Sequence, residues 1–335
     1  MPALLSRRRG ARDPRWPRDF HHRRTTDLLS PLQAYHLLRS FPSRAERRGA
    51  GVPVVDAEPL PPAVAGRIAV TWLGHASALL RLDGVTLLVD PVLAGGIPGA
   101  RRRLTPPPLA PERLPPLDAV LISHDHYDHL DAPTLRRLPR TTPVLVGAGS
   151  APWFARRGFT DVTELDWWES VEVPPRRVEH RSAASPGTRV EFVPAHHWSR
   201  RSPFDTCRRL WGGWVVTAAD GRSVVHAGDT GYGPFHARIG ARQRRLGHDV
   251  AVAVLPVGAY APRALLRGVH MDPAEAVRAA DDLGARRVVP IHWGTFVLSG
   301  ESVLEPLERV RAEWARAGRD PDDLWDLPVG GTGVL

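Results

Sequence analysis

The densest group of metal-ligand residue types in the chain is the segment 123–129, Ser-His-Asp-His-Tyr-Asp-His. It follows a short apolar run, which predicts a buried strand with the segment on the loop at its carboxyl end. Imidazole and carboxylate groups are ligands that zinc and similar divalent ions prefer. His124 and His126 can converge on one ion, and Asp128 and His129 can face a second. The segment therefore predicts a metal-binding loop.

Three further predicted strands also end in histidine or aspartate. These are His196 and His197 after residues 188–193, Asp229 after residues 223–227, and His292 after residues 287–291. A single residue of this kind is commonly structural, but together with the loop they provide five imidazoles and two carboxylates. That set suffices for two ions if one carboxylate bridges them. Composition leaves open whether His196 or His197 is the ligand.

The composition is that of a folded chain rich in loops. Its 335 residues are 42% hydrophobic and include 34 prolines and 30 glycines. The single cysteine, Cys207, excludes an internal disulfide framework and fits a reducing compartment, so a cytoplasmic location is expected. No apolar run approaches the roughly 18 residues that a membrane-spanning helix requires. The arginines at 7–9 are not followed by the apolar segment of an export signal.

The net charge of +9 is concentrated near the N-terminus. Residues 1–50 contain twelve arginines and four acidic residues, which leaves 33 basic and 32 acidic residues in the remainder. A basic arm of this kind fits an anionic membrane surface, a nucleic acid or a solvated tail. The nearly neutral remainder argues against a nuclease, whose catalytic face should be positively charged, and no nucleic-acid partner is expected.

The first 67 residues are predicted to be a basic, proline-rich extension that precedes a domain at 68–335. Within the extension, residues 27–41 have helical spacing, and Pro31 is suited to a first turn. One side of this helix would carry Leu28, Leu32, Tyr35 and Leu38 or Leu37. This apolar stripe could lie on a membrane surface or dock onto the domain. Peripheral contact with the inner face of an anionic membrane is therefore an open expectation.

From residue 68 onward the pattern alternates between short apolar runs and helices. Ten runs have strand character: 68–73, 78–82, 85–89, 118–123, 143–147, 188–193, 213–217, 223–227, 250–256 and 287–291. Asp272, Pro273 and Glu275 predict a capped helix that ends near Gly284, and a second helix is expected from Pro306. Many strands with interspersed helices indicate an α/β protein with mixed sheets.

Together, these motifs resemble those of a known family. The His-x-His-x-Asp-His segment with a later histidine, a Gly-Asp-Thr aspartate and a strand-end histidine is the metal-binding series of the metallo-β-lactamase superfamily. Longer strings are similar to its branch of phospholipases D that hydrolyse N-acyl-phosphatidylethanolamine. They lie in order between residues 68 and 327: Thr-Trp-Leu-Gly-His-Ala-Ser at 71–77, Asp-Pro at 90–91, the stretch 121–131, Glu-Leu-Asp-Trp-Trp-Glu at 164–169, Ala-Gly-Asp-Thr-Gly-Tyr at 227–232, Gly-Ala-Tyr-Ala-Pro-Arg at 258–263, His-Met-Asp-Pro-Ala-Glu at 270–275 and Ile-His-Trp-Gly-Thr-Phe at 291–296.

The resemblance implies a four-layer αβ/βα sandwich with two mixed β-sheets, outer helices and a site for two Zn²⁺ ions. Mn²⁺ or Fe²⁺ would also suit such a mixed ligand set. Carried over by position, one ion would be bound by His124, His126 and His197, and the other by Asp128, His129 and His292, with Asp229 as the bridge. The family string thus favours His197 over His196.

The resemblance also implies a reaction and partners. A hydroxide shared by the two ions would hydrolyse an N-acyl-phosphatidylethanolamine-type phospholipid to an N-acylethanolamine and phosphatidic acid. Asp229 or Asp128 could handle the proton. A homodimer is a further expectation. The alternatives in the same fold are a sugar-phosphate lactonase and another phosphodiesterase or nuclease.

Three residues outside the ligand set have more than one interpretation. His270 directly precedes the helix capped by Asp272, so it could contact a substrate phosphate or make a structural hydrogen bond. Asp90 could orient a ligand histidine or stabilise its Asp-Pro turn. His75 is expected to be structural or to support a ligand rather than to bind metal.

Overall fold

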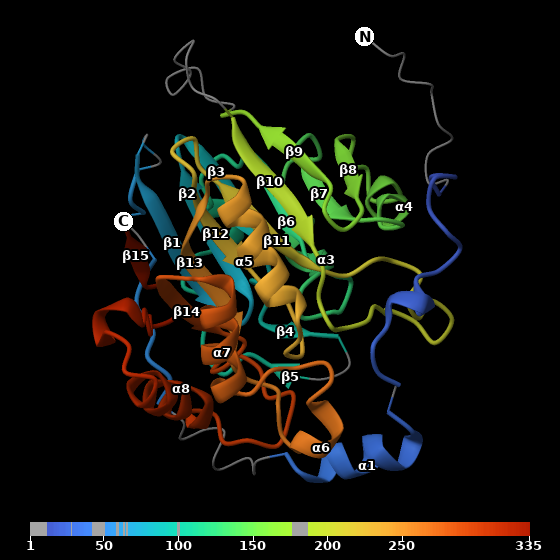
Figure 1. Ribbon diagram of the computed structural model, residues 1–335. Coiled ribbons are helices and arrows are strands. Elements are labelled where there is room, and N and C mark those ends of the chain that lie inside the picture. The colour runs from blue at the N-terminus through green and yellow to red at the C-terminus, as the bar shows by residue number, and fades with distance from the viewer. Residues whose placement is uncertain are drawn as a thin grey trace.

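Two β-sheets packed face to face form the centre of the protein (Figure 1). The computed structural model describes residues 12–27, 29–41, 51–57, 60–62, 64, 66–98, 101–175 and 187–335. The larger sheet has the order β15 (Thr332–Val334), β1 (Ile68–Gly74), β2 (Ser77–Leu82), β3 (Val85–Val89), β6 (Ala119–Ile122), β7 (Val144–Gly147) and β8 (Val162–Leu165). The smaller sheet has the order β14 (Arg287–Ile291), β13 (Asp249–Pro256), β12 (Arg222–His226), β11 (Gly213–Thr217), β10 (Thr188–Val193) and β9 (Ser170–Val173).

Both sheets are mixed, as the sequence indicates. In the larger sheet β3, β6, β7 and β8 run parallel, whereas β15, β1, β2 and β3 pair antiparallel. In the smaller sheet β12, β13 and β14 are parallel, and the other neighbours are antiparallel. The short strands β4 (Gly96–Ile97) and β5 (Arg101–Arg102) form a separate hairpin. All ten predicted strands are present, with bounds that differ by at most one residue at either end.

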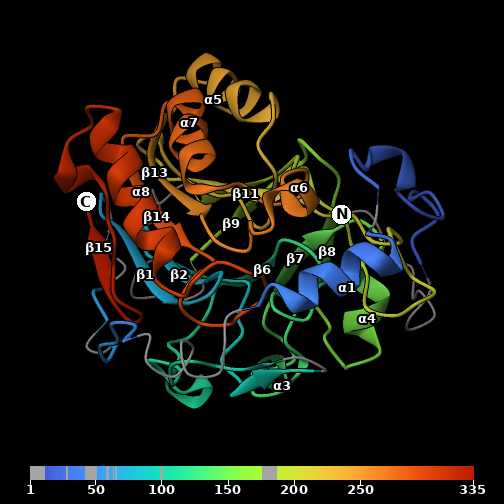
Figure 2. The same ribbon diagram turned by 90° about the horizontal axis from the view of Figure 1, so that it is seen from below.

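Helices cover the outer faces of both sheets, so the fold has four layers (Figure 2). The six-stranded sheet is covered by α5 (Phe235–Arg245), α7 (Pro273–Leu283) and α8 (Glu305–Arg316). The seven-stranded sheet is covered by the short helices α3 (Ala132–Leu135) and α4 (Ala151–Ala155). The remaining described helices are α1 (Pro31–Arg39), α6 (Arg263–Leu266) and the 3₁₀ turns at His21–Arg23, Pro111–Arg113 and Pro321–Asp323. The expected αβ/βα sandwich is confirmed.

Burial on both faces explains the apolar runs that mark the strands. In β3, Leu87 and Val89 pack into the core between the sheets, and Leu88 packs beneath the outer helices. The inter-sheet core also contains the fully buried rings of Trp72 and Trp214. A strand enclosed on both sides must be apolar at nearly every position, which is why these runs do not alternate.

The described part of the N-terminal segment is attached to the domain through Phe20 and Arg23. Phe20 is fully buried and belongs to the main hydrophobic core, and its backbone N–H donates to the Cys207 carbonyl at 2.7 Å. The guanidinium of Arg23 forms a two-point ion pair with Asp166. The division of the chain at residue 67 stays a prediction.

The predicted helix at 27–41 is shorter than expected. It begins at Pro31 because Ser30 caps it: the Ser30 hydroxyl accepts from the Gln33 N–H, and the Gln33 side chain accepts from the Ser30 N–H. The helix ends at Arg39.

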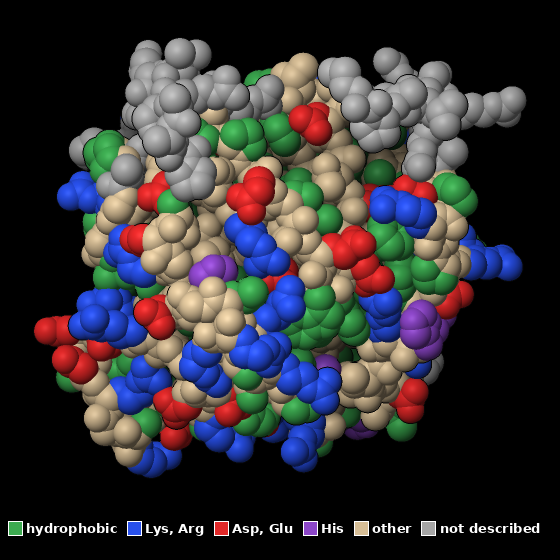
Figure 3. All heavy atoms as spheres, turned by 45° about the horizontal axis from the view of Figure 1, so that its top comes forward, with side chains coloured by type: hydrophobic (Ala, Val, Ile, Leu, Met, Phe, Trp, Pro, Cys, Tyr) green, Lys and Arg blue, Asp and Glu red, His purple; other side chains and the backbone are tan. Residues whose placement is uncertain are grey.

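Two further expectations concern the charge of the domain surface and the presence of a membrane-spanning helix. Basic and acidic side chains lie interspersed on the face in Figure 3, in keeping with a nearly neutral domain. Within the described ranges, no helix combines the length and apolar character needed to cross a bilayer.

Candidate metal centre

The strand ends bring the predicted site residues to one edge of the sandwich. His124 follows β6, His197 follows β10, Asp229 follows β12 and His292 directly follows β14. These strands belong to both sheets, so the site spans the junction between them. The seven predicted residues lie together and their side chains are buried or half-buried. His196 does not join them, because its ring packs beside Phe235.

The first group consists of His124, His126, His197 and Asp229. His126 Nδ1 lies 2.9 Å from His124 Nε2 and 3.2 Å from His197 Nε2. Asp229 Oδ2 is 3.9 Å from His124 Nε2 and 3.8 Å from His197 Nε2. Ligand atoms around a tetrahedral zinc ion are roughly 3.4 Å apart, so these four atoms are spaced as one ion requires.

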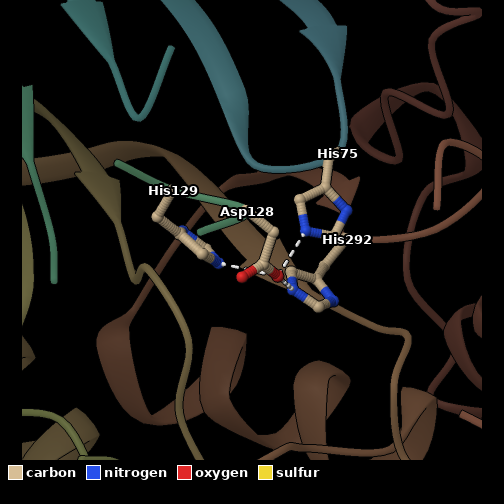
Figure 4. Close-up of side chains that lie close together, drawn as sticks. All are labelled: His75, Asp128, His129 and His292. Atoms are coloured by element: carbon tan, nitrogen blue, oxygen red, sulfur yellow. Dashed lines mark hydrogen bonds and ion pairs between the residues drawn. The ribbon is translucent and has the colours of Figure 1, made fainter. Parts of the chain in front are cut away.

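The second group contains His75, Asp128, His129 and His292, whose side chains point toward one another (Figure 4). Asp128 Oδ2 lies 3.6 Å from His129 Nε2 and 3.5 Å from His292 Nε2. Asp229 also reaches this group, with 3.1 Å from its Oδ2 to His129 Nε2 and 3.1 Å from its Oδ1 to His292 Nε2. Asp229 therefore stands between the two groups, where a bridging carboxylate is expected.

Gly228 permits this position of Asp229. Its φ of +60° lies in the left-handed region that favours glycine, and a Cβ at this position would lie 2.7 Å from the Ser123 Cβ. It would also lie 2.8 Å from the Gly212 carbonyl oxygen. Any side chain would push the 228–229 backbone away from the metal-binding loop.

Unpaired polar atoms show that the residues fit metal ions. Among the described residues, His129 Nε2, His292 Nε2 and Asp229 Oδ1 are buried and make no hydrogen bond of good geometry, although each ring nitrogen lies 3.1 Å from an Asp229 oxygen. Buried polar atoms are nearly always paired, and an unpaired one costs about 1–3 kcal/mol. A divalent ion between these atoms would satisfy them all. The two clusters thus form a divalent metal site.

In the first group, lowered histidine pKa values leave one nitrogen of each ring free of a proton and able to bind a metal ion. Burial lowers the pKa of His124 and His197 well below the ordinary value, and burial also lowers the pKa of His126. Neighbouring imidazoles contribute to the lowered pKa of His124 and His197. These three rings are therefore neutral near pH 7, and a neutral imidazole is the form that binds metal.

In the second group, the carboxylates raise the pKa values of His129 and His292 more than burial lowers them. Burial would lower the pKa of His292, but the carboxylates of Asp229 and Asp128 outweigh it and raise that pKa to about 9. The same carboxylates raise the pKa of His129 well above its usual value. Burial would raise the pKa of Asp229, yet the His129 and His292 rings hold it well below the ordinary range. Two anionic carboxylates here attract positive charge, which a metal ion can supply in place of the ring protons.

Two residues outside the ligand set orient it. Asp90 is fully buried and its Oδ2 accepts from His129 Nδ1 at 2.8 Å, while its Oδ1 accepts from the Ser123 N–H. His75 Nε2 lies 2.9 Å from Asp128 Oδ2. The Asp90 contact holds His129 by the ring nitrogen that faces away from the site, as metal sites commonly require. His75 contacts the same Asp128 oxygen that faces His129 and His292. These contacts agree with supporting roles, but His75 also belongs to a group of residues that could hold an ion, so the roles of Asp90 and His75 stay predictions.

The metal site forms the floor of a cavity of ≈ 540 Å³. His126, Asp128, His197, Asp229 and His292 line the floor. His270 lines the cavity beside it, with its ring 5.3 Å from that of His197 and 5.4 Å from that of His292. The His270 Nδ1 atom has no partner among the described residues, and burial lowers its pKa to about 4.

The cavity wall is largely apolar and comes partly from the N-terminal segment. Leu265, Leu266, Val269 and Leu298 line one part, and Leu29, Gln33, Ala34 and Leu37 from α1 and the residue before its cap line another. Figures 1 and 2 both show α1 beside α6. The outer face of α1 carries Leu32 and Tyr35, which are 65% and 51% exposed.

Sequence reasoning predicted this wall only in part. Docking of the helix on the domain is one of the two expectations, and Leu37, an alternative on the predicted apolar side, lines the cavity with Gln33 and Ala34. Leu32 and Tyr35, predicted on the same side, are exposed instead. The signal that could have found the docked side is Ala34, a small residue that allows close approach. The helix thus has an inner face on the cavity and an outer apolar face in solvent.

Comparison with known proteins places this centre in a family. The model of the Beta-lactamase superfamily domain matches residues 86–293. The chain is 36% identical over 253 residues to the mitochondrial N-acyl-phosphatidylethanolamine-hydrolyzing phospholipase D of Saccharomyces cerevisiae, covering 73% of this chain and 52% of the yeast protein. It is 34% identical to N-acyl-phosphatidylethanolamine-hydrolyzing phospholipase D 1 of Caenorhabditis elegans, covering 72% of this chain and 68% of that protein.

A solved structure supports the fold. Igni18, a metallo hydrolase from the archaeon Ignicoccus hospitalis, has a TM-score of 0.57 and 22% identity, with 80% of this chain and 98% of that chain covered. The chain spans about half the length of its yeast relative. Fold, donor set and relatives agree: the chain belongs to the metallo-β-lactamase superfamily, among relatives that include the N-acyl-phosphatidylethanolamine-hydrolysing phospholipases D.

Proposed function

We propose that this protein is a phosphodiesterase that hydrolyses N-acyl-phosphatidylethanolamine-type phospholipids to an N-acylethanolamine and phosphatidic acid. The observation that carries the proposal is a two-part metal floor beneath an apolar wall in one cavity. The floor suits a phosphodiester, and the leucine-rich wall suits acyl chains. The names of the yeast and nematode relatives support the same substrate class.

The ligand assignment follows the two groups. His124, His126 and His197 would hold one divalent ion, Asp128, His129 and His292 the other, and Asp229 would bridge them. The predominance of imidazole favours Zn²⁺, with Mn²⁺ and Fe²⁺ as alternatives. Such ions supply Lewis acidity that offsets phosphate charge and makes water a better nucleophile near neutral pH.

The protein's own residues bind and position the reactants. Hydrolysis joins a water oxygen to phosphorus, breaks the bond from phosphorus to the N-acylethanolamine oxygen and delivers the water proton to that leaving oxygen. Asp229 or Asp128 can accept that proton, because both carboxylates are anionic and face the floor. His270 stays neutral and its unpartnered Nδ1 is available for a hydrogen bond to a phosphoryl oxygen or to the leaving oxygen.

The α1 wall would bind the acyl part of the substrate. Leu29, Ala34 and Leu37 line the same cavity as Leu298 and the α6 segment. Their contacts would exclude water from the reacting phosphate and strengthen the electrostatic interactions at the floor. Peripheral contact with an anionic membrane, a homodimer and the lack of a nucleic-acid partner stay predictions, as does the cytoplasmic location.

The test uses purified, metal-loaded protein with three substrates. These are N-acyl-phosphatidylethanolamine in mixed micelles, bis-p-nitrophenyl phosphate and a lactone, with products identified by mass spectrometry. We expect an N-acylethanolamine and phosphatidic acid in equal amounts, and slower cleavage of the small diester. Turnover of the lactone alone would exclude the phosphodiesterase, and cleavage of the small diester without the lipid would exclude the lipid substrate.

A further inference from the structure

The metal-binding loop has a second face that no part of the proposed reaction uses. Its residues alternate: His126 and Asp128 line the cavity, whereas Tyr127 between them lines a separate cleft of ≈ 420 Å³. The cleft is bounded by α3, α4 and the loop that follows His197. Four guanidinium groups line it: Arg136, Arg157, Arg201 and Arg209.

Arg201 connects this cleft to the metal-binding loop. Its Nη1 donates to the carbonyl oxygen of Asp125 at 2.7 Å and to that of Leu130 at 2.8 Å, and the Tyr127 hydroxyl donates to the Arg201 carbonyl at 2.8 Å. The guanidinium carbon lies 4.1 Å from the ring centre of Tyr127 and 5.3 Å from that of Trp153. Arg201 is thus a fixed part of the cleft floor.

Each carboxylate at the cleft has at least one oxygen engaged, whereas the Oδ1 atoms of Asp125 and Asp131 have no hydrogen-bond partner among the described residues. Asp205 and Asp125 both pair with Arg209, at 2.9 Å and 2.5 Å from its Nη1. Asp131 caps α3, where one oxygen accepts from both the N–H and the hydroxyl of Thr134. These acids therefore stabilise the walls of the cleft and compensate Arg209.

The guanidinium groups of Arg136 and Arg157 have no such compensation. Within the described ranges neither has a carboxylate at ion-pair distance, and Arg157 makes its hydrogen bond to the backbone carbonyl of Trp153. The Arg157 guanidinium lies 3.7 Å above the Trp153 ring, which orients its plane. Burial, and then the nearby Arg156, Arg136 and Arg209, lower the pKa of Arg157. Repulsion among these cations would be relieved by an anion between them.

We propose that this cleft is a second ligand site, which binds a phosphate-class oxyanion between Arg136, Arg157 and Arg201. Planar guanidinium groups with several N–H donors match the oxygens of phosphate, and stacking on Trp153 and Tyr127 prepares two of them. The oxyanion could be free in solution or be the headgroup of an anionic lipid. Phe204, 84% exposed on the adjoining loop, offers an apolar contact that only a lipid would use.

Titration calorimetry with inorganic phosphate tests the site on the metal-loaded protein. We expect phosphate to bind at the metal floor as well, so wild type should show two classes of site. In the variant Arg136→Ala/Arg157→Ala, one class of site should bind phosphate at least about tenfold more weakly. The other class should bind phosphate as in wild type. Arg156→Ala is the matched control, because Arg156 is exposed nearby but does not line the cleft. The single variant Arg136→Gln, which leaves the Trp153 stack intact, should weaken the same class.

Sedimentation with vesicles separates the two sources of the oxyanion. Binding to phosphatidic acid vesicles but not to phosphatidylcholine vesicles, lost in Arg136→Ala/Arg157→Ala and weakened in Phe204→Ser, would assign the site to a lipid headgroup. Loss of free phosphate binding without any vesicle binding would assign it to a soluble phosphate. A single class of phosphate site in wild type, unchanged in the arginine variants, would overturn the proposal. No turnover is measured, so the outcome is independent of the proposed function.

Discussion

The floor of the cavity and its α1 wall are built in opposite ways. The floor consists of polar side chains at the ends of strands from both sheets, and most of them are buried. The wall is a nine-residue helix outside both sheets, with an apolar inner face and Leu32 and Tyr35 exposed on its outer face. Thr26, just before this helix, packs so closely on Gly268 that a Cβ there would lie 2.1 Å from the Thr26 Cγ2.

From this difference we infer that the floor determines the chemistry and the wall determines which substrates bind. Strand ends in a packed sandwich hold metal ligands within a fraction of an ångström, as metal chemistry requires. A helix joined to the domain by a few contacts can change its inner side chains without disturbing the sheets. We therefore expect floor substitutions to abolish turnover of every substrate, and wall substitutions to affect only substrates with long acyl chains.

The largest effect is expected for Asp229→Asn. The loss of one anionic oxygen from the position between the two groups removes several kcal/mol of charge stabilisation, on the order of 10³-fold in rate. Steady-state kinetics should show this loss for both the lipid and bis-p-nitrophenyl phosphate. Asp249→Asn, an exposed aspartate at the start of β13, is the control and should behave as wild type. Lipid-selective loss in Asp229→Asn would contradict the division into floor and wall.

An intermediate effect is expected for Asp90→Asn. An amide can offer His129 Nδ1 a weaker acceptor, so metal affinity should fall roughly 10–100-fold. Competition with a chelating dye measures this affinity. Asp118→Asn is the matched control: it is a buried carboxylate that accepts from the Thr86 N–H away from the site, so it should lower stability and leave metal affinity unchanged. Equal losses of affinity in both variants would point to general destabilisation.

The smallest effect, and the most selective, is expected for Leu37→Asp. A charge on the inner face of α1 opposes acyl binding, so lipid turnover should fall about tenfold, and cleavage of the small diester should change less than about twofold. Leu32→Asp makes the same change on the exposed face of the same helix and should leave both activities unchanged in micelles. A larger loss in Leu32→Asp would show that α1 acts through its outer face.

The floor could be predicted from sequence because its residues follow apolar runs that are themselves recognisable. The family string distinguished His197 from His196, which composition could not. Helix α7 was equally accessible, since Asp272 and Glu275 form a capping box and Gly284 adopts the left-handed conformation at its end. In each case a local pattern determines a local structure.

Elements that depend on distant contacts could not be predicted in this way. Strands β8 and β9 are short and half-exposed, so they lack an apolar run. Helix α5 contains Gly240, an unfavourable helix residue, which is needed because a Cβ there would lie 2.5 Å from the Asp282 carbonyl oxygen of α7. The α1 wall and the arginine cleft likewise join segments more than fifty residues apart, and no local spacing records such contacts.

Metal analysis of the purified protein tests the central claim most directly. Plasma mass spectrometry of wild type should give close to two divalent ions per chain. His197→Ala and His292→Ala, one from each group, should each lower the content toward one ion. Wild type that retains at most one ion, or variants that both keep two, would contradict a centre in which two ions are held by these seven residues.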